Sequence, residues 1–151
     1  MSEYTSYEAE LKEKGIIIHT NKGTSMMPLL REDRDVMIIE RPNGRLKKYD
    51  VPLYKRPNGQ YVLHRILKVR ENDYVICGDH CVIKEYGITD DQIIGVLTGV
   101  IRDGKQISVT DRGYRFYTHL WCDFLYIRVS ILRIKSFFAR GIRFIKRKLK
   151  K

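Results

Sequence analysis

The sequence predicts a mainly β protein, a coiled set of antiparallel strands with a basic amphipathic helix at its C-terminal end. Short β-branched and aromatic runs recur between Asn-Gly and Asp-Gly turns, a pattern typical of hairpins. After residue 113 the apolar residues recur every three or four positions instead, which is the helical period. The chain of 151 residues is long enough for one domain with a core of its own. We therefore divide it into residues 1–14, 15–112 and 113–151.

Residues 1–14 form either a frayed arm or a short helix. Thr5-Ser6-Tyr7-Glu8 resembles a capping box, and a helix that follows it would run from Tyr7 to Lys14 and end at Gly15.

Residues 15–112 contain seven predicted strands bounded by turns. Pro52 lies inside the third, which indicates an edge strand or a bulge, because proline cannot donate a backbone hydrogen bond. The sequence Arg-Pro-Asn-Gly occurs twice as a turn. The predicted strands cover residues 15–19, 35–40, 49–55, 61–69, 74–77, 93–101 and 107–109.

Residues 113–151 combine a long apolar stripe with a strong positive charge. Residues 128–151 contain ten Lys and Arg and no Asp or Glu, whereas the other 127 residues carry 19 basic and 18 acidic side chains. A basic amphipathic helix is typical of a segment that lies on an anionic membrane surface, so we expect residues 114–151 to bind one. The stripe comprises Leu120, Phe124, Ile127, Ile131, Ile134, Phe138, Ile142, Ile145 and Leu149.

Two alternatives remain for this segment. The helix could pack on the β domain and leave only a solvated basic tail. It could also bind nucleic acid, but attraction to phosphate requires the charges and not so long an apolar stripe, so nucleic acid is not favoured.

Composition and cysteine usage limit the cellular context. The net charge is +11, and the three cysteines are an odd number that does not suggest a disulfide framework. We find no signal-peptide pattern and no apolar run of about 18 residues that could span a bilayer. These features favour a cytoplasmic or peripheral membrane protein.

A serine, a histidine and an aspartate are the candidate catalytic residues. Ser25 lies at a sharp corner, after a glycine-containing turn and before a proline, and a serine needs a base to become a nucleophile. His64, in the apolar segment 62–67, is a suitable base because imidazole titrates near pH 6.5. Asp79 is the best-placed acid to orient that base, with Asp90 and Asp91 as alternatives.

Each of these residues also has an ordinary structural explanation. A serine in a turn, a histidine packed in a core and an aspartate after a glycine are all common without catalysis. Their combination is what favours an enzyme.

Five segments together resemble the type I signal peptidase superfamily, which also contains the self-cleaving SOS repressors. The resemblance covers roughly residues 15–109 and implies the signal-peptidase type of coiled β-sheet domain. Its segments are Gly23-Thr24-Ser25-Met26-Met27-Pro28, Lys48-Tyr49-Asp50-Val51, Val62-Leu63-His64-Arg65-Ile66, Gly78-Asp79-His80 and Ile94-Gly95-Val96.

The resemblance implies a serine endopeptidase of the Ser-His subgroup. Ser25 would attack a peptide carbonyl to form an acyl-enzyme, with the N–H of Ser25 helping to hold the oxyanion. The substrate would be a peptide or protein leader with a small residue at the cleavage position. The substrate groove would be shaped by Gly23, Met26, Met27 and Pro28.

The sequence departs from the superfamily at three places. Tyr49 replaces a glycine of the family pattern, and Gly23 stands where many members carry a hydroxyl. The charged residues 8–14 do not resemble the transmembrane anchor of signal peptidases, so we expect the C-terminal helix to replace it.

The sequence leaves a metal site and a non-catalytic function as alternatives. Cys77, His80 and Cys81 could ligate zinc, with His64 or His119 as a fourth ligand, but a buried cysteine is more often a small apolar residue, so we expect no metal site and no cofactor. A non-catalytic module that binds a peptide or a membrane is the alternative to an enzyme.

Overall fold

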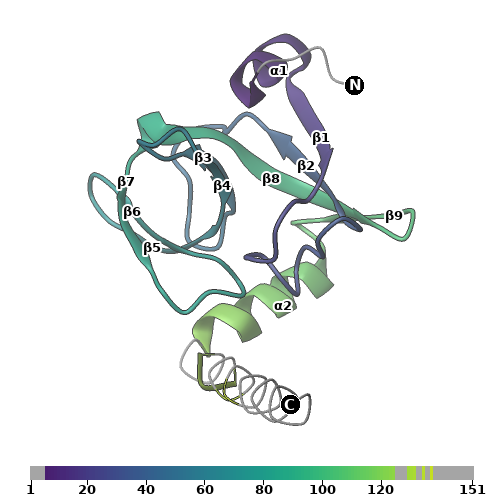
Figure 1. Cartoon of the computed structure of the whole chain (residues 1–151), viewed down its shortest axis with the longest axis vertical. Helices are drawn as coiled ribbons and strands as arrows, with labels where there is room; N and C mark the ends of the chain where they lie inside the picture. Colours follow the sequence, from purple (N-terminus) through teal and green to yellow (C-terminus); the bar gives the residue numbers. More distant parts are fainter. Residues whose placement is uncertain (1–5, 125–128, 132–133, 135–136, 138–151) are drawn as a thin grey trace, which may run out of the picture.

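The computed structural model describes residues 6–124, 129–131, 134 and 137. It confirms a mainly β protein, in which a curled antiparallel half-barrel sheet and a smaller sheet are followed by a C-terminal helix (Figure 1). The larger sheet has the order β1-β2-β8-β3-β4, with β9 paired to β8, and the smaller has the order β5-β6-β7. The strands are β1 (Ile16–Thr20), β2 (Val36–Glu40), β3 (Pro52–Lys55), β4 (Tyr61–Leu63), β5 (Arg65–Val69), β6 (Tyr74–Cys77), β7 (Glu85–Ile88), β8 (Ile93–Arg102) and β9 (Lys105–Ser108).

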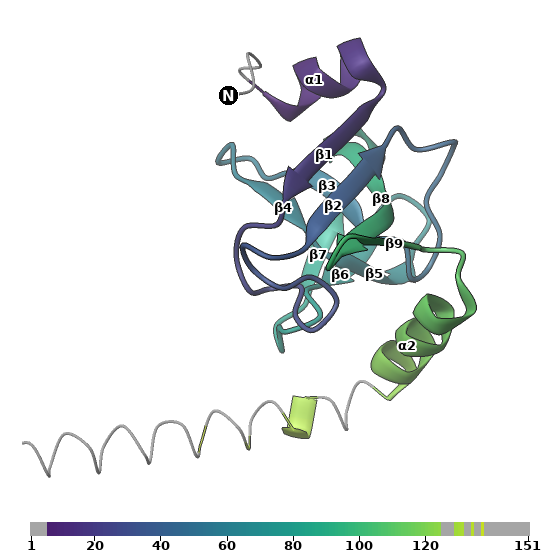
Figure 2. The same cartoon turned by 90° about the vertical axis from the view of Figure 1, so that its right-hand side faces the viewer.

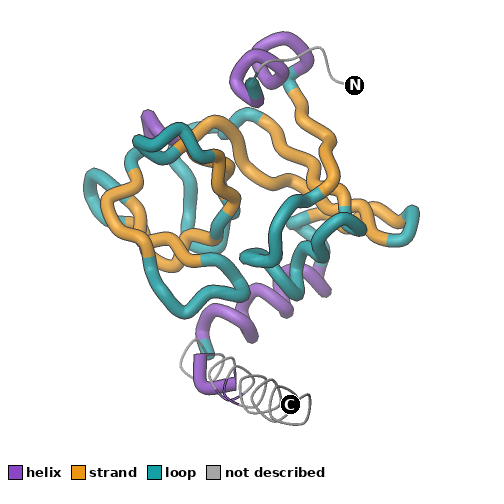
Figure 3. The backbone as a smooth tube through the Cα atoms, in the orientation of Figure 1, coloured by secondary structure: helices purple, strands orange, loops and turns teal. Residues whose placement is uncertain are grey.

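The helices α1 (Tyr7–Lys14) and α2 (Arg112–Asp123) lie at opposite ends of the β domain (Figures 2 and 3). The helix predicted over Tyr7 to Lys14 is observed with these bounds. The Ser6 side chain accepts a hydrogen bond from the Ala9 N–H, and Gly15 ends the helix with φ 75°. A short 3-10 helix, η1 (Asp90–Gln92), precedes β8.

Two apolar cores lie beneath the two sheets. The larger includes Ile17, Leu30 and Val100, and the smaller includes Tyr54, Ile66 and Ile76.

The strand predicted over residues 61–69 is two strands. β4 belongs to the larger sheet and β5 to the smaller, and His64 is the single residue between them. The sequence shows a continuous β-forming run here, because a chain that passes from one sheet to the next keeps the same apolar character. His64 therefore sits at the junction of the two sheets.

The third predicted strand begins later than expected. Tyr49 has φ 82°, which is left-handed backbone and not a strand conformation, and β3 starts at Pro52. Pro52 was expected to mark an edge strand or a bulge, and β3 lies between β8 and β4, so it is not an edge strand. The expected irregularity is present, since the register with β8 shifts between Leu53 and Tyr54.

The C-terminal helix is two-faced in the part that the structure describes. Tyr114, Thr118 and Cys122 are buried against the β domain, whereas Phe116, Leu120 and Phe124 are 51–70% exposed. Ile131 and Ile134 of the predicted stripe are also exposed. The other stripe residues, Ile127, Phe138, Ile142, Ile145 and Leu149, lie outside the described residues. Among the residues described, no helix has the length and apolarity needed to cross a bilayer.

Candidate active site

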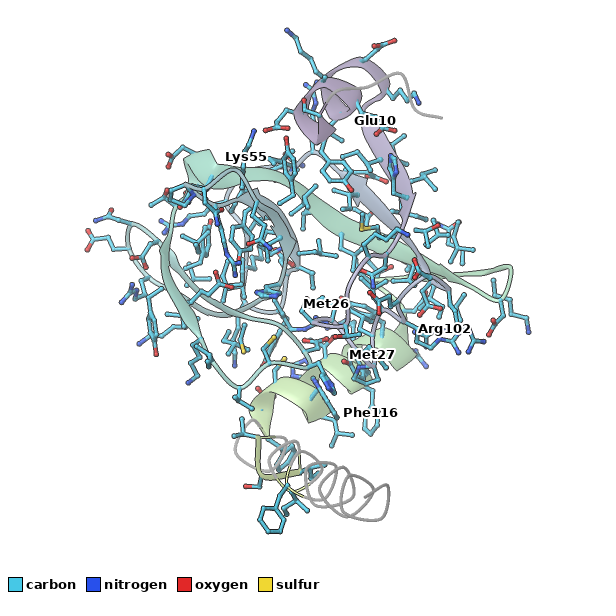
Figure 4. The ribbon with its side chains drawn as sticks, viewed as in Figure 1. Glu10, Met26, Met27, Lys55, Arg102 and Phe116 are labelled. Carbon is cyan, nitrogen blue, oxygen red and sulfur yellow. The ribbon has the colours of Figure 1, made fainter. Side chains whose placement is uncertain are left out.

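Ser25 lies in the loop that joins β1 to β2 and is partly exposed. The adjacent Met26 is 1% exposed and anchors the loop in the larger core, together with Leu30. The Leu30 N–H donates to the Met26 carbonyl at 2.9 Å, which closes one helical turn after the serine. This turn fixes the backbone just beyond Ser25, and Figure 4 labels Met26 and Met27 within it.

The four residues expected to shape a substrate groove differ in burial. Met26 is 1% exposed and belongs to the larger core, and it is the one of the two methionines that is buried there. Met27 and Gly23 are partly exposed and Pro28 is exposed. Gly23 has φ 86°, a backbone conformation that favours glycine.

Arg102, in β8, holds the other end of the same loop (Figure 4). Its guanidinium donates to the Leu29 carbonyl at 2.6 Å and to the fully buried carboxylate of Asp35 at 2.6 Å. Arg31 donates to the same carboxylate at 3.0 Å. Burial alone would raise the pKa of Asp35, but the two guanidinium groups outweigh it and lower the pKa to about 2.

We expect the protein to become less stable when acid protonates the Asp35 carboxylate. Because the pKa of Asp35 is lower in the folded state than its ordinary 3.8, its contribution is present above pH 4 and is lost as the pH falls towards 2. The free energy of unfolding should drop by roughly 2 kcal/mol over this window. Urea titrations at several pH values measure it. Asp35→Asn should lack the drop, Asp33→Asn should keep it, and identical acid profiles for the two variants would contradict the assignment.

His64 is buried at the junction of the two sheets, with 7% exposure. Its Nδ1 lies 2.8 Å from Oε1 of Glu85, the first residue of β7. When the neutral ring keeps its proton on Nδ1 for this carboxylate, Nε2 carries the lone pair. Burial lowers the pKa of His64 below its usual 6.5, although Glu85 acts in the opposite direction. Burial therefore favours the neutral form of the His64 imidazole.

Glu85 is itself held in place by two side chains. Arg56 donates to Oε2 at 2.9 Å and the hydroxyl of Tyr54 donates to Oε1 at 2.9 Å. Burial acts to raise the pKa of Glu85, but these hydrogen bonds outweigh it and keep the pKa below its usual value. The carboxylate therefore stays ionised beside the imidazole.

Gly78 brings the serine loop and the histidine together. A Cβ built on Gly78 would lie 2.6 Å from the carbonyl oxygen of Ser25 and 3.0 Å from Nε2 of His64. The separation between the Ser25 carbonyl oxygen and Nε2 of His64 is therefore at most the sum of these two distances. Only glycine allows the two segments to approach this closely.

Asp79, which was expected to orient His64, is engaged by other side chains. Both oxygens of Asp79 are bound by Arg65, at 2.9 and 2.7 Å, and Oδ2 also accepts a hydrogen bond from Tyr117. Asp90 and Asp91, the alternatives, lie in η1, and the acid that contacts His64 is Glu85. Asp79 instead neutralises a fully buried arginine adjacent to the histidine.

Sequence reasoning missed Glu85 because β7 was not predicted. A faint signal exists, since Glu85 is the only acidic residue between Asp79 and Asp90 and begins a short run with an aromatic and a β-branched residue. Pairing with His64 depends on how β7 folds back on β6, which no local pattern specifies.

Among the described residues, no group of three or more His, Cys, Asp or Glu is placed to hold a metal ion. Cys77 is 1% exposed, and its thiol contacts the carbonyls of Cys81 and Ile83. Comparisons with family models, curated proteins and solved structures gave no match for this chain.

Proposed function

We propose that this protein is a serine endopeptidase of the signal-peptidase type, with Ser25 as nucleophile and His64 as general base. The observation that carries the proposal is the hydrogen bond between Nδ1 of His64 and Glu85, with Nε2 and the serine loop both against Gly78. A nucleophile, a base and an orienting acid in this order are the components of serine peptidases on unrelated folds. The sequence motifs around Ser25, His64 and Asp79 give independent support.

The reaction follows from these positions. Oγ of Ser25 bonds to the substrate carbonyl carbon as its proton passes to Nε2 of His64. His64 then donates this proton to the amine, the C–N bond breaks and an acyl-enzyme remains. A water molecule gives a proton to His64 and its hydroxide to the acyl carbon, and Ser25 leaves with the proton from His64.

The direct test is cleavage of a peptide library, with and without lipid vesicles. Wild type should cleave, and Ser25→Ala and His64→Ala should not. Thr24→Ala is the matched control, because it removes an exposed hydroxyl next to Ser25. A phosphonate probe should label wild type at Ser25. Absence of both cleavage and labelling in wild type would instead favour the non-catalytic module that binds a peptide or a membrane.

The substrate, a peptide or protein leader, is proposed to be cleaved at an anionic membrane surface. The exposed side chains of Phe116 and Leu120 lie four residues apart on one face of α2, the exposed Phe124 directly follows the helix, and Phe116 projects outward (Figure 4). The following sequence, residues 128–151, carries ten positive charges and no negative one. An apolar face joined to basic residues matches the chemistry of anionic lipid.

Membrane binding makes a separate prediction. The double variant Phe116→Ser/Leu120→Ser should bind vesicles that contain phosphatidylglycerol at least about tenfold more weakly, because two apolar side chains leave the lipid. Co-sedimentation measures this. Ile18→Ser is the control, since Ile18 is 52% exposed on β1 and away from α2. Equal binding by all three proteins would contradict the proposed surface.

A further inference from the structure

One face of α2 contacts the residues that adjoin the catalytic pair. The Tyr117 hydroxyl donates to Oδ2 of Asp79 at 2.8 Å, and the indole N–H of Trp121 donates to the Asp79 carbonyl at 2.8 Å. Nη1 of Arg65 donates to the hydroxyls of Tyr114 and Thr118 at 3.2 and 3.4 Å. These four helix residues are spaced at helical intervals and face the β domain together.

Asp79 lies in the turn that contacts Ser25. The N–H of the next residue, His80, donates to the Ser25 carbonyl at 2.8 Å, and the preceding Gly78 packs against the same carbonyl and against His64. The N–H of Cys81 donates to the Gly78 carbonyl at 3.0 Å, which closes the turn. A displacement of Asp79 would therefore move the backbone that sets the place of Ser25 relative to His64.

We propose that Tyr117 and Trp121 are positioning residues of the peptidase, which act through Asp79 on Ser25 and His64. Tyr117 donates a hydrogen bond to the side chain of Asp79 and Trp121 donates one to its backbone carbonyl. Together they fix both the carboxylate and the turn. Burial raises the pKa of Tyr117, so the hydroxyl keeps its proton and remains a donor. The two rings stack with centroids 5.9 Å apart, which keeps both donors in place.

The structure offers a matched control for this proposal. The hydroxyl of Tyr49 also ties the β domain to α2, but it donates to Asp123 and does not touch Asp79. Tyr49→Phe removes a hydroxyl of the β domain that bonds to α2, and Tyr117→Phe removes a hydroxyl of α2 that bonds to the β domain. Only the bond lost in Tyr117→Phe is made to Asp79, in the turn that contacts Ser25.

Amide hydrogen exchange of the full chain tests the proposal without any assay of activity. The His80 N–H, which is bonded to Ser25, should exchange about tenfold faster in Tyr117→Phe and in Trp121→Phe than in wild type, because a hydrogen bond to the turn is lost. The Leu97 N–H, bonded to the Val51 carbonyl in the larger core, should be unaffected. Tyr49→Phe should leave both amides as in wild type.

Two results would overturn the proposal. One is a His80 rate in Tyr117→Phe that matches Tyr49→Phe. The other is an equal acceleration at His80 and Leu97, which would show general loss of stability.

The kinetic part of the inference rests on the proposed function. With a cleaved peptide in hand, Tyr117→Phe should lower kcat and leave KM unchanged, because the substrate still binds while the reacting groups are displaced. A rise in KM at constant kcat would contradict positioning. If wild type cleaves no peptide, the proposed function fails, and the exchange rates at His80 still decide whether α2 fixes the turn.

Discussion

Glu85→Gln is expected to lower kcat about 10³-fold or more while the protein remains folded. An ionised Glu85 accepts the proton of Nδ1 and leaves the lone pair of His64 on Nε2. A glutamine amide can donate to Nδ1 instead, and the proton of the neutral imidazole then lies on Nε2. In that tautomer Nε2 cannot accept the proton of Ser25. The loss should appear in kcat at pH 7 with a cleaved peptide.

The pH dependence should shift in a defined direction. Wild-type activity should fall as the pH drops through the pKa of His64, which burial places below 6.5. Glu85 raises that pKa, so in Glu85→Gln the residual activity should persist to a lower pH than in wild type.

A suitable control is Glu71→Gln, which changes an exposed acid in the turn between β5 and β6. It should retain wild-type kcat. The assignment of Glu85 fails if Asp79→Asn, in folded protein, moves the acidic limb of the pH profile while Glu85→Gln does not.

Arg65→Met is expected to reduce the free energy of unfolding by about 3–5 kcal/mol. The side chains of Arg65 and Asp79 are both fully buried, and the substitution leaves the Asp79 carboxylate charged without its cation. The Tyr49 carbonyl and the hydroxyl of Tyr114 would also lose a donor. Urea denaturation measures the change.

Arg70→Met provides the comparison, because Arg70 forms a similar pair with Asp73 at the surface. Exposed pairs contribute about 0–1 kcal/mol, so this variant should be nearly as stable as wild type. The double variant Arg65→Met/Asp79→Leu should recover part of the loss, since neither charge is then buried alone. Equal stability of Arg65→Met and Arg70→Met would refute the role of the buried pair.

Local patterns were sufficient for the elements whose signals are local. α1 has a capping serine and a terminal glycine within the element, and β6 is a short apolar run bounded by turns. Ser25 and His64 also came from short motifs, and the structure brings the segments that carry them together against Gly78.

The remaining features depend on contacts between distant segments. The division of residues 61–69 at His64 follows from two sheets that meet there, and the sequence has no breaker at that point. For the same reason, the acid that contacts His64 is not one of the three that the sequence suggested. Asp79 faces the arginine next to His64, while Glu85 reaches the imidazole only after β7 pairs with β6.

The helix period was recognised, but the face of α2 that packs was not. The predicted stripe of Leu120 and Phe124 is exposed, and the buried contacts come from Tyr114, Thr118 and Cys122. Hydrophobicity alone could not identify this face. Its contacts with the β domain include hydrogen bonds between hydroxyl and indole groups of α2 and the buried pair of Arg65 and Asp79.

The place of α2 in the chain has a consequence for synthesis. A growing polypeptide has completed β1 through β7, with Ser25, His64 and Glu85, well before Tyr114 to Trp121 are added. Until then Arg65 and Asp79 lack their helix partners, and the turn beside Ser25 lacks the hydrogen bonds that Tyr117 and Trp121 donate to Asp79. If the chain is the proposed peptidase, the support of its serine turn is completed only when α2 is made, after the strands around Ser25, His64 and Glu85.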